Sequence, residues 1–126
     1  MKILTPKQRS DWMSAITDFA SSTSWMLDKF GGRCDNPYHM QRHHIYGKEA
    51  KRKINFETTN VGHCAILPVP FELHDVGSNN NLNVTHNKKA FESVFGTQKE
   101  LLADMVEQMR ELGYHVPFDD ELIEAL

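Results

Sequence analysis

The chain has 126 residues, of which 40% are apolar and 25% are charged, and its formal net charge is −3 at pH 7. This composition is ordinary for a soluble globular protein of one domain, and we expect a single domain over residues 1–126. No apolar run approaches the roughly 20 residues of a membrane-spanning helix, and no signal peptide is evident. Two cysteines, Cys34 and Cys64, make no disulfide framework, so we expect a reducing, cytoplasmic setting.

The first predicted element is a helix over about residues 6–30. Thr5 followed by Pro6 is typical of an N-cap with proline at the first helical position. The polar run 21–24 predicts a bend in this helix, and Gly31-Gly32 ends it. Apolar residues recur at near-helical spacing and predict a face that packs on the core: Trp12, Ile16, Phe19, Ala20, Met26, Leu27 and Phe30.

Two short strands are expected in the middle of the chain. Residues 33–62 show little periodicity and predict loops around one short strand near 41–46. The apolar run 64–70 predicts a buried strand, and its two prolines place that strand at a sheet edge or end it early. A polar loop follows at 77–83.

Helices are predicted again in the last third of the chain. Asn87 opens a short helix that Gly96 closes, and Thr97 caps a longer helix that ends at Gly113. One or two helical turns are expected from Asp119. The predicted fold class is therefore α+β, with a small sheet flanked by helices.

Histidine is the informative feature of the composition, because six of the seven histidines fall in residues 39–86. A neutral imidazole ligates metal ions and has a pKa of about 6.5, so this clustering is expected at a metal site, a proton-transfer site or both. Charge is uneven as well: residues 33–53 carry six Lys/Arg against two acidic residues, and residues 97–126 carry two against eight. Phosphate would favour the first region, although an ordinary mixed surface is the simpler explanation of the charge alone.

The histidines follow the order of the predicted elements. The doublet His43-His44 lies on the first strand, His74 follows the second strand, and His86 precedes the short helix. Three imidazoles around one ion would leave positions for water and a phosphate oxygen, which is the open arrangement of a catalytic metal site. Taken singly, each histidine is more simply a hydrogen-bonded surface or core residue.

The sequence His43-His44-Ile45, followed by Leu67-Pro68-Val69 and then by His74, resembles the ββα-metal fold of HNH nucleases. In that family a strand ends in Asp-His or His-His, a second strand leads to another histidine, and a helix completes the metal site. The run Asn83-Val84-Thr85-His86, with Phe91-Glu92 further on, is more specifically similar to the family of phage RecA-dependent nucleases called Ref. The resemblance covers about residues 34–96 and implies an HNH-like core between helices.

The resemblance also implies a role for each residue of the motif. His44 would be the general base that activates water, while His43, His74 and His86 would hold a divalent ion such as Zn, Mg or Mn. The asparagine that orients the base in the family falls at Ala65 here, so Asn60 is the best substitute. The chain would then be a phage-encoded endonuclease that hydrolyses phosphodiester bonds in DNA.

Contacts with the substrate are implied by the basic loop that follows the doublet. The four residues expected to bind phosphate there are Lys48, Lys51, Arg52 and Lys53. A solvated loop explains these charges nearly as well. The same likeness raises a recombinase filament as a partner beside DNA.

Other functions fit the same residues. Pro70 and Leu73 stand where a paired-cysteine zinc knuckle would fall, so no structural zinc of that kind is expected. A non-catalytic, zinc-stabilised module that binds nucleic acid or protein remains an alternative, as does a helical interaction protein with incidental histidines. Cys34 and His39 would need other ligands to hold a second, structural ion, and His63 has no assigned role.

Overall fold

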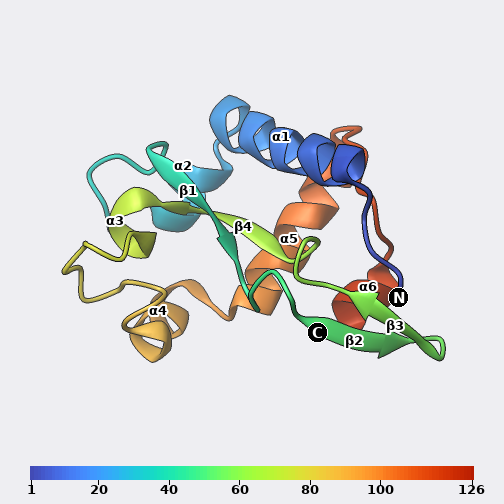
Figure 1. Ribbon diagram of the computed structural model, residues 1–126. Coiled ribbons are helices and arrows are strands. Elements are labelled where there is room, and N and C mark those ends of the chain that lie inside the picture. The colour runs from blue at the N-terminus through green and yellow to red at the C-terminus, as the bar shows by residue number, and fades with distance from the viewer.

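The structure is a computed structural model that describes residues 1–126. Its six helices and four strands give the mixed α+β fold that the sequence predicts (Figure 1). None of the helices has the length and apolar character needed to cross a lipid bilayer. The elements are, in chain order, α1 (Pro6–Ser22), α2 (Trp25–Phe30), β1 (Met40–His44), β2 (Lys51–Ile54), β3 (Glu57–Asn60), β4 (Ile66–Pro70), α3 (Phe71–His74), α4 (Lys88–Phe95), α5 (Gln98–Glu111) and α6 (Asp120–Glu124).

The amino-terminal helix begins as predicted but ends earlier. The Thr5 hydroxyl accepts from the Gln8 N–H at 3.1 Å, and the Gln8 side chain accepts from the Thr5 N–H at 2.8 Å, which is a capping box. The predicted single helix over 6–30 is in fact two helices, because Thr23 is extended with φ −124°. The Thr23 N–H makes the last helical bond, to the Phe19 carbonyl, and the Thr23 hydroxyl bonds the same carbonyl where the helix ends.

The four strands form two separate antiparallel pairs, β1 with β4 and β2 with β3. The β1–β4 register places His43 opposite Leu67 and His44 opposite Ile66. The β2–β3 hairpin lies where the sequence predicted only loops, so that prediction was wrong for residues 51–60. Its two turn residues, Asn55 and Phe56, have φ of 51° and 67°. Such turns are usually marked by Asn-Gly, and an aromatic residue with positive φ is uncommon, so the turn carried little sequence signal.

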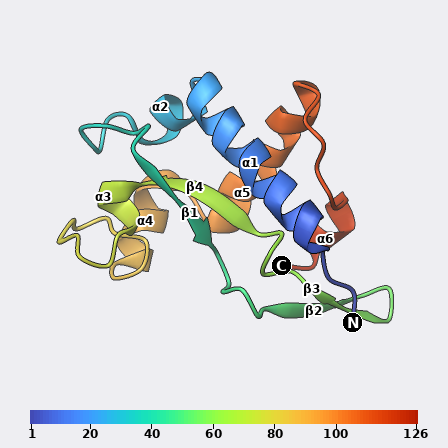
Figure 2. The same ribbon diagram turned by 45° about the horizontal axis from the view of Figure 1, so that its top comes forward.

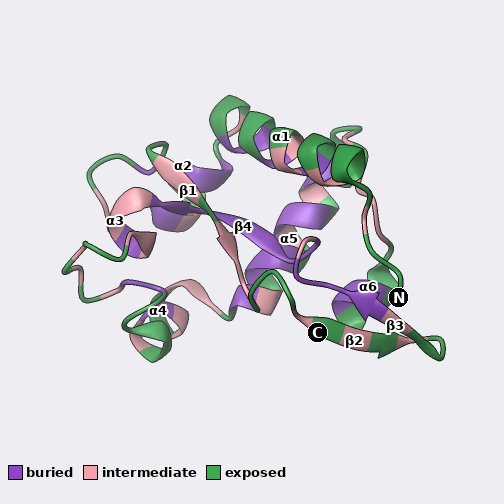
Figure 3. Ribbon diagram, viewed as in Figure 1, coloured by how far each residue is buried: buried purple, intermediate pink, exposed green.

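β4 is the centre of the core. All five of its residues are buried, as Figure 3 shows, and α1, α2 and α5 pack against it. The two prolines predicted an edge strand, and they are tolerated because β1 is the one strand that pairs with β4. The main cluster of 20 buried residues runs from Trp12 of α1 to Ile123 of α6, so helices on both sides of the sheet share one core.

The helices of the last third are confirmed. Thr97 caps α5 by accepting from the Glu100 N–H at 3.1 Å. Gly96 and Gly113 follow α4 and α5 with φ of 94° and 87°, the left-handed conformation that favours glycine at helix ends. In Figure 2, α1 lies beside β4 and α5 lies behind it, and both helices pack against this strand. β1 is in contact with α3 as well as with β4.

A polar cluster ties α2 to α5. The Asp104 carboxylate accepts from Trp25 Nε1 at 2.9 Å, from Lys29 Nζ at 3.0 Å and from Gln108 Nε2 at 3.0 Å. Burial raises the pKa of Asp104, but these hydrogen bonds outweigh it and hold that pKa below its ordinary value. The ionised carboxylate therefore contributes to stability.

Replacing Asp104 by Ala should lower the free energy of unfolding by about 1 kcal/mol at pH 7, after allowance for solvent screening. Because the folded pKa lies below the unfolded value of about 3.9, the contribution is complete above that value and disappears as pH falls through the folded pKa. Urea unfolding at pH 7 and at a series of lower pH values down to about 2 measures this difference. Glu107→Ala, an exposed change on the same helix, is the control and should cost nothing. A cost for Asp104→Ala that is the same at pH 7 and in acid would contradict the assignment.

Candidate active site

β1 distributes the histidine doublet over two faces. Side chains alternate along a strand, so Gln41 and His43 point to one side and Arg42 and His44 to the other. Arg42 reaches the Thr17 hydroxyl of α1 at 3.5 Å. We call the side of Gln41 and His43 the His43 face, and the side of Arg42 and His44 the His44 face.

Two imidazoles lie in contact on the His43 face. The ring centroids of His43 and His74 are 4.9 Å apart, with an interplanar angle of 64°. His43 Nε2 lies 2.7 Å from Gln98 Oε1, and His74 Nδ1 lies 2.5 Å from Gln41 Oε1. Because an amide oxygen is an acceptor, these two nitrogens carry the protons, and His43 Nδ1 and His74 Nε2 keep their lone pairs. Metal-ligating histidines have this arrangement, in which an oxygen acceptor fixes the second ring nitrogen.

Both rings are neutral at pH 7. Burial is the main reason that the pKa of His43 falls to about 4, and the hydrogen bond to Gln98 only partly opposes it. Burial also lowers the pKa of His74, while the charge of Asp75 acts in the other direction. A neutral imidazole is the form that binds a metal ion, so the protein holds these rings ready for ligation without a competing proton.

Two glutamines that the sequence analysis did not single out hold this pair of rings. Gln98 is 4% exposed and is the first residue of α5. Gln41 donates its amide to Asp75 Oδ1 at 3.1 Å while its oxygen accepts from His74. Gln41 was recognisable in principle, because it precedes His43 by two positions on one strand. Gln98 lies 55 positions from His43, and no sequence pattern links them.

His86 is held beside the end of α3 by the fully buried Asn83. The Asn83 amide donates to the Asp75 carbonyl at 2.9 Å, and its oxygen accepts from the His86 N–H at 3.1 Å. The His86 ring itself is hydrogen-bonded to another group, because its Nε2 lies 3.1 Å from the Val76 carbonyl oxygen. The structure therefore brings His43 and His74 together and anchors His86 near the segment after His74, but no group of three or more His, Cys, Asp or Glu side chains is arranged to hold a metal.

This donor set fits an open metal site better than a closed one. Two neutral imidazoles suit Zn or Mn and leave positions for water or a phosphate oxygen, whereas a structural zinc needs four protein ligands. Cys34 and His39 do not come together as a second site. The Cys34 thiol contacts the Phe30 carbonyl at 3.5 Å, and the His39 ring stacks on Phe71 with centroids 4.9 Å apart.

On the His44 face, His44 lies near His63, with ring centroids 6.1 Å apart. The His44 ring makes no hydrogen bond within the chain. Neither of its nitrogens is buried without a partner, so both are open to solvent. Burial lowers the pKa of His44 most, and nearby positive charge, foremost that of Lys48, lowers it further. A neutral imidazole with a free nitrogen is suited to accept a proton from water.

Asn60, the predicted orienting residue, makes no hydrogen bond to His44. Its side chain is 2% exposed, its amide donates to the Lys48 carbonyl at 3.0 Å, and its oxygen accepts from the His63 N–H at 3.2 Å. Both ends of the amide therefore fasten the loop after β1 to the loop after β3. Asn60 positions the backbone of Lys48 and His63 instead of the His44 ring.

The four predicted phosphate contacts divide between two places. Lys48 lies in the loop after β1 near His44, whereas Lys51, Arg52 and Lys53 lie on β2. Lys51 and Lys53 are exposed on one side of the hairpin, and the Arg52 guanidinium lies 5.2 Å from the centre of the Tyr46 ring. None of the four takes part in an ion pair, so their charges are available to a polyanion.

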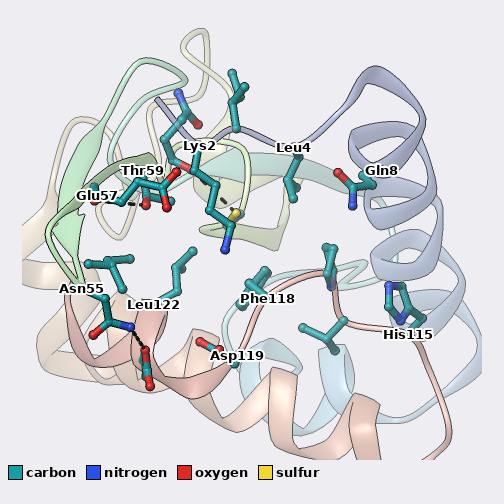
Figure 4. Close-up of a pocket in the computed structure, with 17 residues that line it drawn as sticks. Lys2, Leu4, Gln8, Asn55, Glu57, Thr59, His115, Phe118, Asp119 and Leu122 are labelled. Carbon is teal, nitrogen blue, oxygen red and sulfur yellow. Dashed lines mark hydrogen bonds between the residues drawn. The ribbon is translucent and has the colours of Figure 1, made fainter.

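A cavity of about 530 Å³ lies apart from these histidines, between the amino-terminal segment, the β2–β3 hairpin and the residues before and within α6 (Figure 4). Lys2, Leu4, Phe118 and Leu122 point into it. Neither the His43–His74 pair nor His44 lines this space. Asn60 does line it, and the Asn60 amide also bonds the loops that carry Lys48 and His63.

On one side of β1, His43 of the strand and His74 of α3 form a pair of potential metal ligands. On the other side, the free imidazole of His44 lies among cations. β1 pairs antiparallel with β4, the β2–β3 hairpin lies between these two strands in the chain, and α3 follows β4 directly. No known protein family matches the sequence, and no characterised protein or solved structure matches it either.

Proposed function

We propose that this chain is a metal-dependent nuclease that hydrolyses phosphodiester bonds in DNA, with an HNH-like core formed by β1, β4, α3 and α4. The observation that supports this most is the contact between His43 and His74, whose rings are 4.9 Å apart. His44, the neighbour of His43 in the chain, has unpartnered ring nitrogens. The chain thus has a pair of potential ligands on one face of β1 and a free base on the other face, and metal-assisted hydrolysis needs both kinds of group.

His43 and His74 would hold the divalent ion, with His86 as the predicted third ligand. The ion, when bound, supplies positive charge that stabilises the scissile phosphate and the leaving oxygen. His44 would take a proton from the attacking water through a ring nitrogen, since its lowered pKa leaves it neutral at pH 7. Gln98 would orient His43 through its amide oxygen.

The charge distribution supports a polyanionic substrate. Lys48 lies beside His44, and Lys51 and Lys53 line the exposed side of β2. Contacts of this kind bind phosphates without reading the base sequence. DNA as the substrate and a recombinase filament as a partner stay predictions.

Supercoiled plasmid should be nicked by the purified protein when Mn, Mg or Zn is added, and should stay intact with a chelator. His74→Ala should weaken zinc binding by at least about tenfold, since one of two adjacent imidazoles is lost. Calorimetric titration with zinc measures the affinity, and gel analysis of the plasmid measures cleavage. His115→Ala, a histidine outside the 39–86 cluster, is the control.

The outcomes separate the nuclease from the alternative functions. Zinc binding that depends on His74 but is never accompanied by cleavage would favour the zinc-stabilised binding module. Failure of any divalent ion to bind or to shift the melting temperature would contradict both and leave a helical interaction protein.

A further inference from the structure

We infer that the His44 face carries a phosphate-binding site formed by Arg9 of α1 with His63 and Lys48, and that its ligand is a phosphodiester of a polynucleotide backbone. The inference rests on the proposed function for the identity of the substrate, but its residues are separate from the His43–His74 pair. It gives α1, which the sequence predicted only as a core-packing helix, a part in substrate binding.

One stripe of α1 lies along the His44 face. Arg9, Met13 and Thr17 are spaced by four residues and therefore share a side of the helix. Thr17 is contacted by Arg42 of β1 at 3.5 Å, and Arg9 Nη1 lies 3.4 Å from His63 Nε2. The Thr17 contact places this stripe against β1, the strand that carries His44, and the Arg9 contact places it against the loop after β3.

The Arg9 guanidinium lacks an anionic partner. The chain has three ion pairs, and they involve Lys7, Lys29 and Arg110. Arg9 Nε is the single buried side-chain nitrogen or oxygen of the chain without a hydrogen-bond partner. Such a group in a native protein calls for an explanation, and an oxygen ligand is one. A phosphate seated against the guanidinium would supply acceptors in the bidentate geometry that arginine favours.

His63 and Lys48 complete the site. Because the arginine can only donate, His63 Nε2 accepts from it, which leaves the ring proton on Nδ1 as a further donor. Burial and then the charge of Arg9 lower the pKa of His63, so the ring is neutral in the absence of an anion. Lys48 faces both His63 and His44, and Glu49 is the acidic group that faces His63. With Arg42 included, three cations outnumber one carboxylate.

The loops that carry His63 and Lys48 are built rigidly. The buried Asn60 amide bonds the Lys48 carbonyl and the His63 N–H, at 3.0 and 3.2 Å. Val61 donates to the Ala50 carbonyl at 2.9 Å, which closes the same two loops on each other. A phosphate held here would lie on the side of β1 that carries the free imidazole of His44. The site would thus position the backbone of the substrate beside the proposed base.

Binding is tested without metal, so that cleavage plays no part. Anisotropy of a fluorescein-labelled single strand of about 12 nucleotides is followed with a chelator present. Arg9→Met should weaken binding by about tenfold and lower the slope of log affinity against log salt by about 0.7, one phosphate contact. Lys7→Met removes an equal charge from the same helix, where Lys7 pairs with Asp11 at 2.8 Å, and should change neither quantity.

Two further variants keep the test decisive if Arg9→Met does not fold, which a thermal melt reveals. Arg9→Lys should restore part of the affinity and the salt slope, because the charge remains while the fork of donors is lost. His63→Gln should weaken binding with no change in net charge at pH 7. The inference would be overturned if Arg9→Met and Lys7→Met lost the same amount of affinity for the oligonucleotide. It would also be overturned if neither Arg9→Lys nor His63→Gln bound the oligonucleotide more weakly than the wild type.

Inorganic phosphate distinguishes the two sources of the same ligand chemistry. The His63 ring signals in an NMR spectrum should shift strongly with the oligonucleotide and weakly with inorganic phosphate. An equal, saturable response to free phosphate would overturn the assignment to a polynucleotide. Binding that depends on Arg9 in a protein that never cleaves DNA with any metal would contradict the nuclease and leave this site in place.

Discussion

Replacing His44 by Ala should reduce plasmid cleavage by a factor on the order of 10²–10⁴, the usual contribution of a general base. Zinc affinity should stay at the wild-type value, because the two rings in contact, His43 and His74, are untouched. Initial nicking rates with Mn and calorimetric titration with zinc measure the two quantities on the same protein. The separation of the two effects follows from the strand, which places His43 and His44 on opposite faces.

The comparison variant is His115→Ala, which removes an imidazole from a segment distant in the sequence and should cleave normally. Wild-type cleavage by His44→Ala would exclude His44 as the base. A simultaneous loss of zinc affinity would instead identify His44 as a ligand, and the proposed division of tasks between the two faces would be wrong.

Replacing Gly62 by Ala should lower the free energy of unfolding by about 3 kcal/mol, at the upper end of the usual cost of overpacking. A Cβ atom at this position would lie 2.3 Å from the Gly47 carbonyl oxygen and 2.4 Å from the Lys48 carbonyl oxygen. These are backbone atoms that cannot rotate away. Differential scanning calorimetry should show a melting temperature that is lower by roughly 10 °C.

Gly32→Ala is the matched change, because a Cβ atom there meets nothing within 4 Å. It should leave the melting temperature unchanged or raise it slightly, since alanine restricts the unfolded chain. If Gly62→Ala and Gly32→Ala have the same melting temperature, the loops after β1 and β3 are not packed as closely as in this structure.

The strands that carry the histidines were predictable, and the hairpin between them was not. The apolar run around Ile66 and Leu67 is buried on every side, and burial leaves a composition signal. β2 is a lysine-rich strand with two exposed positions, and its turn contains Phe56 in place of the expected glycine. A strand held mainly by backbone pairing leaves little trace in its side chains.

Only part of the candidate site was predictable, because local patterns reveal neighbours along a helix or strand. The positions of His43 and His74 relative to the two predicted strands indicated that the two imidazoles lie close together. The contacts of His43 with Gln98 and of Arg9 with His63 join residues 55 and 54 positions apart. Such pairs arise from the packing of α5 and α1 on the sheet, and no window of sequence contains both members.

The five-residue strand β1 also limits how this protein can vary in length. Adding or removing one residue before His43 within the strand would shift the doublet by one position, so that each imidazole moved to the opposite face of the strand. An insertion would bring His43 to the position that His44 now holds among the cations, and a deletion would bring His44 to the position that His43 now holds against Gln98. Insertions beside the exposed Asn79 and Asn81 of the polar loop carry no such penalty, so divergent copies of this chain should differ in length there and keep the spacing of β1 constant.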